Sequence, residues 1–482
     1  MLIVINKYMV FQSIEYLLFL LITFTLYWTL CKNSKFLQNA LIVLASIVFY
    51  GWWDWRFLGL LLITTFSTYY AGAFIKQLAT NVRGRKSVFI VSIVLNLGIL
   101  FFFKYYNFFV ESLVDAFSMM GISLGLSTIK IILPIGISFY TFSALSYVID
   151  VYQKRIEPTK DVIAYMAYIM FFPSILSGPI SRAQQQLPQY SSIRKFDYDN
   201  AVNACLLFLW GATMKLCLAD RLGIYIDTVY ANISQHNGTT LLLASVLYTI
   251  QIYADFAGYS LMAIGSGKLF GIDLQTNFIR PYFSTTITDF WRRWHISLTT
   301  WFRDYIYFPL GGNRCSKSRW ILNTLIVFTI SGLWHGAAYA FLMWGVLHGV
   351  GMVVERLVYG DKLKILSNKF SFANIFRWLV TFIFVNFAWI PFRVNNIAEV
   401  KDIFAKIFSS IGYPFMDQNT LSMAFIAFVL VFANDFAEEK SWNIRLLRSK
   451  NRIIRYISVI LLICYILAFG VLNGGSFIYF QF

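Results

Sequence analysis

Charged residues are scarce in this chain, and their scarcity excludes most soluble proteins. Asp, Glu, Lys and Arg make up 13% of the 482 residues, whereas 58% are hydrophobic. A soluble domain carries about 25% charged residues, so a soluble globular enzyme and a disordered protein are both excluded. The sequence predicts an all-α, polytopic membrane protein that forms one membrane-embedded domain over residues 1–482.

Cysteine is also rare, and no pattern of Cys and His suggests a disulfide framework or a metal centre. Five cysteines cannot all pair, and the chain contains neither CxxC nor HExxH. Residues 265–268 (GSGK) resemble the end of a P-loop but lack its first glycine, and no GxSxG elbow is present. We therefore expect no metal and no permanently bound cofactor.

Acidic residues are outnumbered by basic ones, which gives a net charge of +17. The basic residues form short clusters between apolar runs instead of one patch, so we expect no nucleic-acid partner. In membrane proteins such clusters mark cytoplasmic loops. The clusters after the first and third runs, and a basic segment at 435–455, are predicted to be cytoplasmic, which places the N-terminus outside.

Long apolar runs dominate the rest of the sequence and predict about 11 spanning helices, with the remaining runs re-entrant or interfacial. The thirteen candidate runs are Ile14–Leu30, Leu37–Trp53, Phe57–Ile75, Val88–Phe103, Ile129–Ile149, Val162–Leu176, Ala201–Ala219, Leu241–Phe256, Trp320–Trp334, Ala337–Val354, Ile375–Phe392, Leu421–Phe436 and Ile453–Leu472. Strict alternation would place the basic stretch 257–319 outside. Either one element between residues 160 and 285 is re-entrant, or Ala257–Leu274 adds a broken crossing.

Residues 277–314 are too rich in charge to span a membrane. Thr288 is a candidate helix N-cap, and Pro309 with the following glycines is a candidate stop. On a helix of 100° per residue, aromatic side chains share one face, and the adjacent polar face carries Arg292, His295, Thr299 and Arg303. Such a helix either contacts anionic lipids at the interface or presents its polar stripe to a cavity, where guanidinium groups suit the phosphates of a donor.

The segment SGLWHGAA at 331–338 places His335 between two apolar runs. A neutral imidazole can take a proton from a hydroxyl group, as O-acyl transfer requires, and small neighbours such as Gly336 allow a substrate to approach closely. The alternative is a structural histidine that bonds a carbonyl. His348 follows 13 residues later, a rotation of about 220° on one helix, so we expect it to lie on a different face.

These residues carry a resemblance to a known family. FWRRWHISLTTWFRDYIYFPLGGNR, with GLWHG 40 residues after its histidine, is similar to the membrane-bound O-acyltransferase (MBOAT) family. Within it, the match is to the bacterial branch that contains the membrane subunits for alginate and peptidoglycan O-acetylation. FFPSILSGPISRAQQQLPQ at 171–189 and the C-terminal FIYFQF add weaker similarity.

The resemblance implies a bundle around a central histidine site. By motif position, His335 would be the catalytic histidine and His295 its partner. From the polar stripe and the residues beside His335, we expect substrate to contact Arg292, Arg303, Trp334, Gly336 and Ser331. The resemblance also implies acetyl-CoA, or an acyl carrier thioester, as the donor substrate. A narrow channel would reach His335 from both faces of the membrane.

The predicted function is transfer of an acyl group, most simply acetyl, from a cytoplasmic donor toward an extracytoplasmic polysaccharide. The location would be the bacterial cytoplasmic (inner) membrane, with membrane lipid and a separate periplasmic acyltransferase as partners. The alternatives are a D-alanyl transferase that uses an acyl carrier protein, a transporter and a non-catalytic scaffold. The Tyr-x-Pro-Leu-Gly-Gly element that ends at Gly312 favours acetyl over D-alanyl, and the lack of internal repeats disfavours a transporter.

Overall fold

The computed structural model describes residues 9–360, 371–394, 396–442, 447, 449, 451–472, 477 and 478. All regular elements of these residues are helices, which confirms the predicted all-α fold. Two sequence features lie partly outside the described residues, namely the last four residues of FIYFQF and several basic residues of the segment 435–455.

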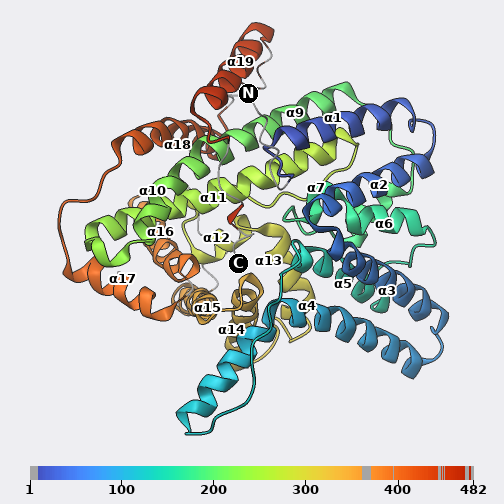
Figure 1. The fold of residues 1–482 in the computed structure, drawn as a ribbon, viewed down its shortest axis with the longest axis horizontal. Coiled ribbons are helices and arrows are strands. Elements are labelled where there is room, and N and C mark those ends of the chain that lie inside the picture. Colours follow the sequence, from blue (N-terminus) through green and yellow to red (C-terminus); the bar gives the residue numbers. More distant parts are fainter. Residues whose placement is uncertain are drawn as a thin grey trace. The chain divides into compact units, whose positions relative to one another are not determined.

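The chain divides into two compact units, each built from two stretches of sequence (Figure 1). The first unit contains Met1–Cys205 and Ala263–Gln275, and the second contains Leu206–Met262 and Thr276–Phe482. The division falls inside two long helices, so neither unit is one continuous segment. Whether the chain acts as the single domain expected from its sequence stays a prediction.

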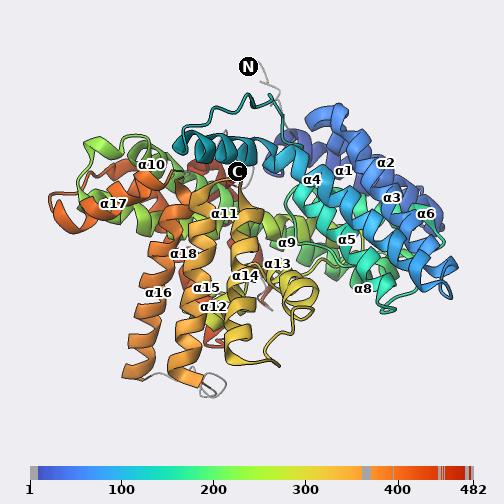
Figure 2. The same cartoon turned by 90° about the horizontal axis from the view of Figure 1, so that it is seen from below.

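The first unit consists mainly of N-terminal helices, and α2 to α6 pack against one another within it (Figure 2). Its helices are α1 (Ile14–Thr29), α2 (Lys35–Asp54), α3 (Leu58–Gln77), α4 (Val82–Met119), α5 (Ile137–Tyr152), α6 (Val162–Met170), α7 (Phe172–Ile175), α8 (Ala183–Gln186) and the start of α9 (Tyr198–Thr213).

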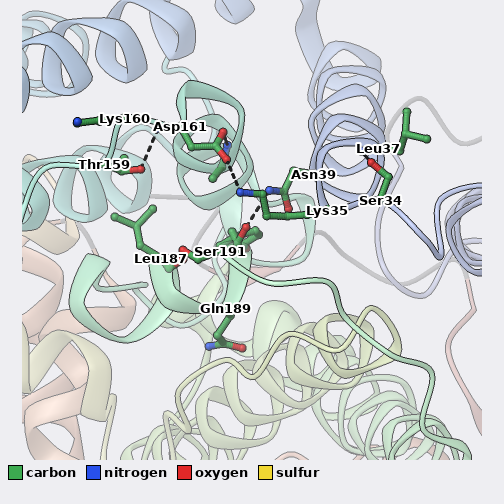
Figure 3. A network of polar contacts seen from close by, with 12 residues as sticks. Ser34, Lys35, Leu37, Asn39, Thr159, Lys160, Asp161, Leu187, Gln189 and Ser191 are labelled. Carbon is green, nitrogen blue, oxygen red and sulfur yellow. Dashed lines mark hydrogen bonds and ion pairs between the residues drawn. The ribbon is translucent and has the colours of Figure 1, made fainter.

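Polar side chains cap the starts of α2 and α6 in this unit (Figure 3). Ser34 caps α2, and Asp161 caps α6 by accepting a hydrogen bond from the N–H of Ala164 at 3.0 Å. The same Asp161 carboxylate lies 3.2 Å from Lys35 Nζ, at the start of α2. One carboxylate therefore accepts a hydrogen bond from an otherwise unpaired N–H group of α6 and connects the start of this helix to α2.

The second unit carries the remaining helices. They are the end of α9 with a π-helical turn (Met214–Ala219), α10 (Asp220–Tyr230), most of α11 (Gly238–Leu269), α12 (Ile287–Arg293), α13 (Ile296–Phe302) with a π-helical turn (Arg303–Tyr307), α14 (Lys317–His335), α15 (Tyr339–Tyr359), α16 (Phe372–Arg393), α17 (Ile397–Ser409), α18 (Gln418–Glu439) and α19 (Arg452–Phe469). In Figure 2, α14, α15 and α16 run side by side.

Glycine allows α14 and α15 to cross at very short range. A Cβ atom on Gly332 of α14 would lie 2.2 Å from the carbonyl oxygen of Phe341, and one on Gly345 of α15 would lie 2.3 Å from that of Phe328. Small residues at helix crossings let membrane helices approach until their backbones touch. This crossing fixes the end of α14, which carries His335, against α15.

Eight helical segments of the described residues are long and apolar enough to cross a membrane, so the chain is a multi-pass membrane protein. One of the eight, Lys35–Gln77, contains both α2 and α3. α1 has only 16 residues. The predicted number of about 11 spans is not confirmed and stays a prediction.

The structure distinguishes between the two explanations for the position of residues 257–319. The alternative of a broken crossing at Ala257–Leu274 is wrong, because α11 continues as one helix to Leu269. By contrast, α6 has nine residues and α7 has four, far fewer than the roughly 20 that a span requires. Neither α6 nor α7 can therefore span a membrane alone, and the identity of the re-entrant element between residues 160 and 285 stays a prediction.

Candidate active site

The segment predicted to be one interfacial helix is two short helices, α12 and α13. The predicted cap Thr288 is wrong, because Thr286 caps α12 by accepting a hydrogen bond from the N–H of Asp289. The buried carboxylate of Glu355, on α15, accepts hydrogen bonds from the N–H groups of Ile287 and Thr288. The first turn of α12 is thus held by its own cap and by a second helix.

A backbone break separates the two helices at His295. This residue has φ +42° and ψ 53°, in the left-handed region that few non-glycine residues adopt. Asn277 stabilises the break, since its carbonyl accepts from the N–H of Ile296 at 2.9 Å and its side chain accepts from Ser297 Oγ at 2.6 Å. The expected faces at 100° per residue are therefore wrong beyond Trp294, because they assumed one continuous helix.

His295 lies in aromatic surroundings and is 1% exposed. Its ring meets that of Phe256, on α11, edge to face with the centroids 4.6 Å apart, and it lies 6.0 Å from the ring of Trp334. Burial lowers the pKa of His295 to about 3. The imidazole is therefore neutral near pH 7, as a proton acceptor must be.

His335 is the last residue of α14 and is 3% exposed. Its ring centroid lies 4.9 Å from that of Trp334, 4.9 Å from that of Trp344 and 5.1 Å from that of Phe392. Trp334 therefore contacts both His335 and His295. The structure brings the two predicted histidines into one aromatic cluster, with a predicted substrate contact between them.

His348 belongs to the same cluster, although the sequence argument separated it from His335. It lies on α15 and is fully buried, and its Nδ1 accepts a hydrogen bond from Trp291 Nε1 at 3.3 Å. The ring of Trp344 lies 4.9 Å from His335 and 5.0 Å from His348. The expected separation of His348 from His335 is wrong, because the chain leaves its helix at Gly336 and begins a new one at Tyr339.

A cavity of about 520 Å³ lies beside this cluster. Of the predicted substrate contacts, Arg292, Arg303 and Ser331 line it, whereas Trp334 and Gly336 do not. Its lining includes neither His295 nor His335, so the cavity does not extend to His335 as the expected channel would. Among the residues that line the cavity, Ser331 is nearest in sequence to His335, and the two residues are about one helical turn apart on α14.

The cavity is basic. Arg356, which no sequence signal singled out, is a third guanidinium in its lining and lies over the ring of Trp320 at 4.7 Å. No Asp or Glu occurs among the described lining residues. Arg303 pairs with the neighbouring Asp304 at 2.7 Å, whereas Arg292 and Arg356 form no ion pair with the described residues. Such a cavity suits an anionic ligand with an apolar portion.

A buried ion cluster lies next to Phe256. Lys215 Nζ is 2.7 Å from Asp220 and 2.5 Å from Asp255, and the second oxygen of Asp255 accepts from the N–H of Ile478 at 2.8 Å. The sequence could have indicated this cluster, because its ionisable residues lie in or beside apolar runs. The cluster attaches the described C-terminal residues to α11.

Comparison with known proteins gives consistent matches. Residues 47–400 match the family described as membrane-bound O-acyltransferase. The "Probable alginate O-acetylase AlgI" of Pseudomonas syringae pv. tomato is 36% identical over 416 residues, which cover 86% of this chain and 78% of that protein. The peptidoglycan O-acetyltransferase of Helicobacter pylori is 32% identical and covers 77% of this chain and 74% of its own length. The teichoic acid D-alanyltransferase of Bacillus subtilis is 29% identical, over 54% of this chain and 68% of its own length.

Proposed function

The chain belongs to the membrane-bound O-acyltransferase family, and from this premise we propose that it moves an acetyl group from a cytoplasmic thioester toward an extracytoplasmic polysaccharide by way of a separate acyltransferase, with His335 as general base. The observation that carries the proposal is the pairing of a buried histidine cluster with a basic cavity in one unit. We also propose that the chain functions as a single membrane domain in the bacterial cytoplasmic membrane.

In the proposed reaction, His335 accepts one proton and then gives it up. As an acceptor hydroxyl attacks the thioester carbonyl, His335 takes the hydroxyl proton, a C–O bond forms, the C–S bond breaks, and the proton passes to the departing thiolate. His295 is proposed as the partner histidine, because Trp334 contacts both rings. Gly336 and Trp334 would border the reacting atoms.

The donor is proposed to bind in the basic cavity as acetyl-CoA. Arg292, Arg303 and Arg356 would contact its phosphates, and the apolar remainder of the cavity would hold its pantetheine arm. From Ser331 to His335 is about 6 Å along α14, at a rise of about 1.5 Å per residue. Only the thioester end has to pass Ser331, so a bulky head group would stay in the cavity.

The charge of the flanking segments supports the proposed direction of transfer. Three basic residues surround the start of α14 (Arg314, Lys317 and Arg319) and mark that end as cytoplasmic. The lining residues near Trp320 and Arg356 would then face the cytoplasm, where the donor is made. His335 lies at the other end of α14, toward the opposite side of the membrane. We propose that a separate acyltransferase receives the acetyl group on that side.

D-alanyl transfer from an acyl carrier protein is the second candidate. It is supported by the similarity to the teichoic acid D-alanyltransferase, but that match covers 54% of the chain, against 86% for the alginate O-acetylase. A transporter or a scaffold has no comparable support.

The test is acetyl transfer from labelled acetyl-CoA in membranes that contain the protein. We expect His335→Ala to lose on the order of 10²–10⁴-fold in rate while the protein still inserts. His236→Ala is the matched control, because His236 lies in the loop before α11, where its ring packs against that of Phe415. Wild-type transfer by His335→Ala would contradict the proposal and favour a scaffold, while transfer only from a carrier thioester would favour the second candidate.

A further inference from the structure

His348 forms a directed polar contact inside an otherwise aromatic environment. It is fully buried, and its ring is surrounded by those of Trp291, Trp344 and Phe384 at centroid distances of 5.0, 5.0 and 5.5 Å. A buried polar group costs stability unless it is hydrogen-bonded. The described partner of His348 is Trp291, whose indole N–H lies 3.3 Å from Nδ1.

This hydrogen bond fixes the protonation state of His348. An indole N–H can only donate, so Nδ1 must accept and cannot carry a proton. A neutral imidazole then carries its proton on Nε2, which is buried with no hydrogen-bond partner among the described residues. His348 therefore holds Trp291 through one nitrogen atom.

Trp291 connects His348 to the cavity. Its side chain lines the cavity, as does that of Phe328, whose ring lies 6.4 Å from His348. On the other side of His348, Trp344 packs against both His348 and His335. The imidazole of His348 thus lies between the cavity wall and the ring that supports His335.

A second residue of α15 holds the same short helix. Glu355 binds the first turn of α12 through Ile287 and Thr288, and His348 binds α12 through Trp291. The two residues of α15 are seven positions apart, about two turns, and therefore share one face. α12, which also carries Arg292, is fixed to α15 at two points.

We propose that His348 is a positioning residue for the acyl donor: by accepting the Trp291 indole N–H, it holds that indole in the wall of the cavity. The inference rests on the proposed function, in which this cavity binds the donor. His348 takes no proton in the reaction. Its loss is therefore expected to weaken donor binding more than it slows the chemical step.

Two variants with the same branching and the same number of side-chain heavy atoms separate the hydrogen bond from packing. In His348→Asn the amide oxygen takes the place of Nδ1, whereas His348→Leu has the same shape without an acceptor. We expect the KM for acetyl-CoA to be about tenfold higher in His348→Leu than in His348→Asn, which is the loss of one buried hydrogen bond, with kcat changed less than threefold. Equal KM values in the two variants would overturn the proposal in favour of simple packing.

Trp291→Phe supplies the other side of the test, since it keeps a ring but removes the donor. If His348 acts through Trp291, His348→Leu adds no further increase in KM once Trp291 is Phe. Full additivity of the two changes would overturn the proposal, because His348 would then act by another route.

A spectroscopic measurement examines the contact without turnover. In protein labelled with ¹⁵N-tryptophan, the indole signal that disappears in Trp291→Phe belongs to Trp291. We expect it to move upfield in His348→Leu and to stay near its wild-type position in His348→Asn. An unchanged signal in His348→Leu would overturn the proposal.

Binding of CoA to the purified full chain then distinguishes failure of the inference from failure of the proposed function. Weaker CoA binding by His348→Leu supports the positioning role even if the wild type transfers no acetyl group, in which case only the proposed function fails. CoA binding that is equal in the wild type and both variants overturns the positioning role.

Discussion

The histidine cluster and the basic cavity are neighbours, yet they are built from opposite chemistry. His295, His335 and His348 are almost fully buried, and their described contacts are mainly aromatic rings. The cavity instead gathers three guanidinium groups with no described carboxylate in its lining. A buried carboxylate beside an imidazole would favour its protonated form, which cannot act as a base. Each region therefore meets a different need: the aromatic surroundings keep an imidazole neutral, and the guanidinium groups suit an anionic donor.

After the loss of His335 itself, the largest effect is expected at its partner in the histidine cluster, His295. His295→Asn is the most suitable change, because asparagine tolerates the left-handed backbone at φ +42° better than most residues do. We expect kcat for acetyl transfer to fall on the order of 10²-fold or more while KM for acetyl-CoA stays within about threefold. Expression and melting temperature measured beside the rates serve as the folding control. A variant with full kcat would remove His295 from the reaction.

Changes in the cavity should have the opposite kinetic signature. Arg292→Gln and Arg356→Gln are each expected to raise KM for acetyl-CoA about tenfold, the loss of one charge-assisted contact, with little change in kcat. Arg303→Gln should do less, since Asp304 already pairs with Arg303. Arg56→Gln is the matched control, because Arg56 is an exposed arginine that pairs with Asp54 in the other unit. If these variants lowered kcat and left KM unchanged, the cavity would not be the donor site.

The comparison also shows what the sequence could predict. Composition and apolar runs predicted the helices, and the position of His335 beside small residues predicted a buried histidine at a helix end. Arg292 and Arg303 were predicted as donor contacts from the polar stripe, because guanidinium groups suit phosphates, and both line the cavity. Each of these conclusions depends only on the residues nearby in the sequence.

Features that depend on distant contacts were missed. The break at His295 is stabilised by Asn277, which no pattern at 100° per residue includes. His348 joins the cluster only because the chain begins a new helix after His335. Arg356 reaches the cavity through the packing of α15 against α12. Periodicity describes one helix at a time, so it cannot identify such neighbours.

A smaller effect is expected at Gly336, next to the catalytic histidine. Any Cβ atom there would lie 2.1 Å from Cε2 of Phe341, whose ring packs against Phe392 and thereby borders His335. Gly336→Ala should cost about 1–3 kcal/mol of stability by overpacking and reduce kcat by less than His295→Asn does. Phe341→Leu in the same protein should restore part of both losses, because it makes room for the new methyl group. If the double variant is no better than the single one, the clash with Phe341 is not the cause.

The smallest effect concerns the pH dependence of stability, and it measures how well the histidine cluster excludes charge. Burial lowers the pKa of His295 to about 3, from an ordinary value of 6.5. Above pH 6.5 the residue is neutral in both the folded and unfolded states and contributes no pH dependence. As the pH falls from 6.5 toward 3, the unfolded chain gains a proton that the folded chain does not, so stability decreases. The contribution is at most about 1.4 kcal/mol per pH unit.

Denaturation of the wild type and of His295→Asn between pH 7 and pH 5 should show a steeper loss of stability for the wild type. Contributions from the other histidines cancel in this difference. Parallel curves would mean that His295 binds a proton as readily in the folded chain as in water, and that the aromatic surroundings do not keep its imidazole neutral.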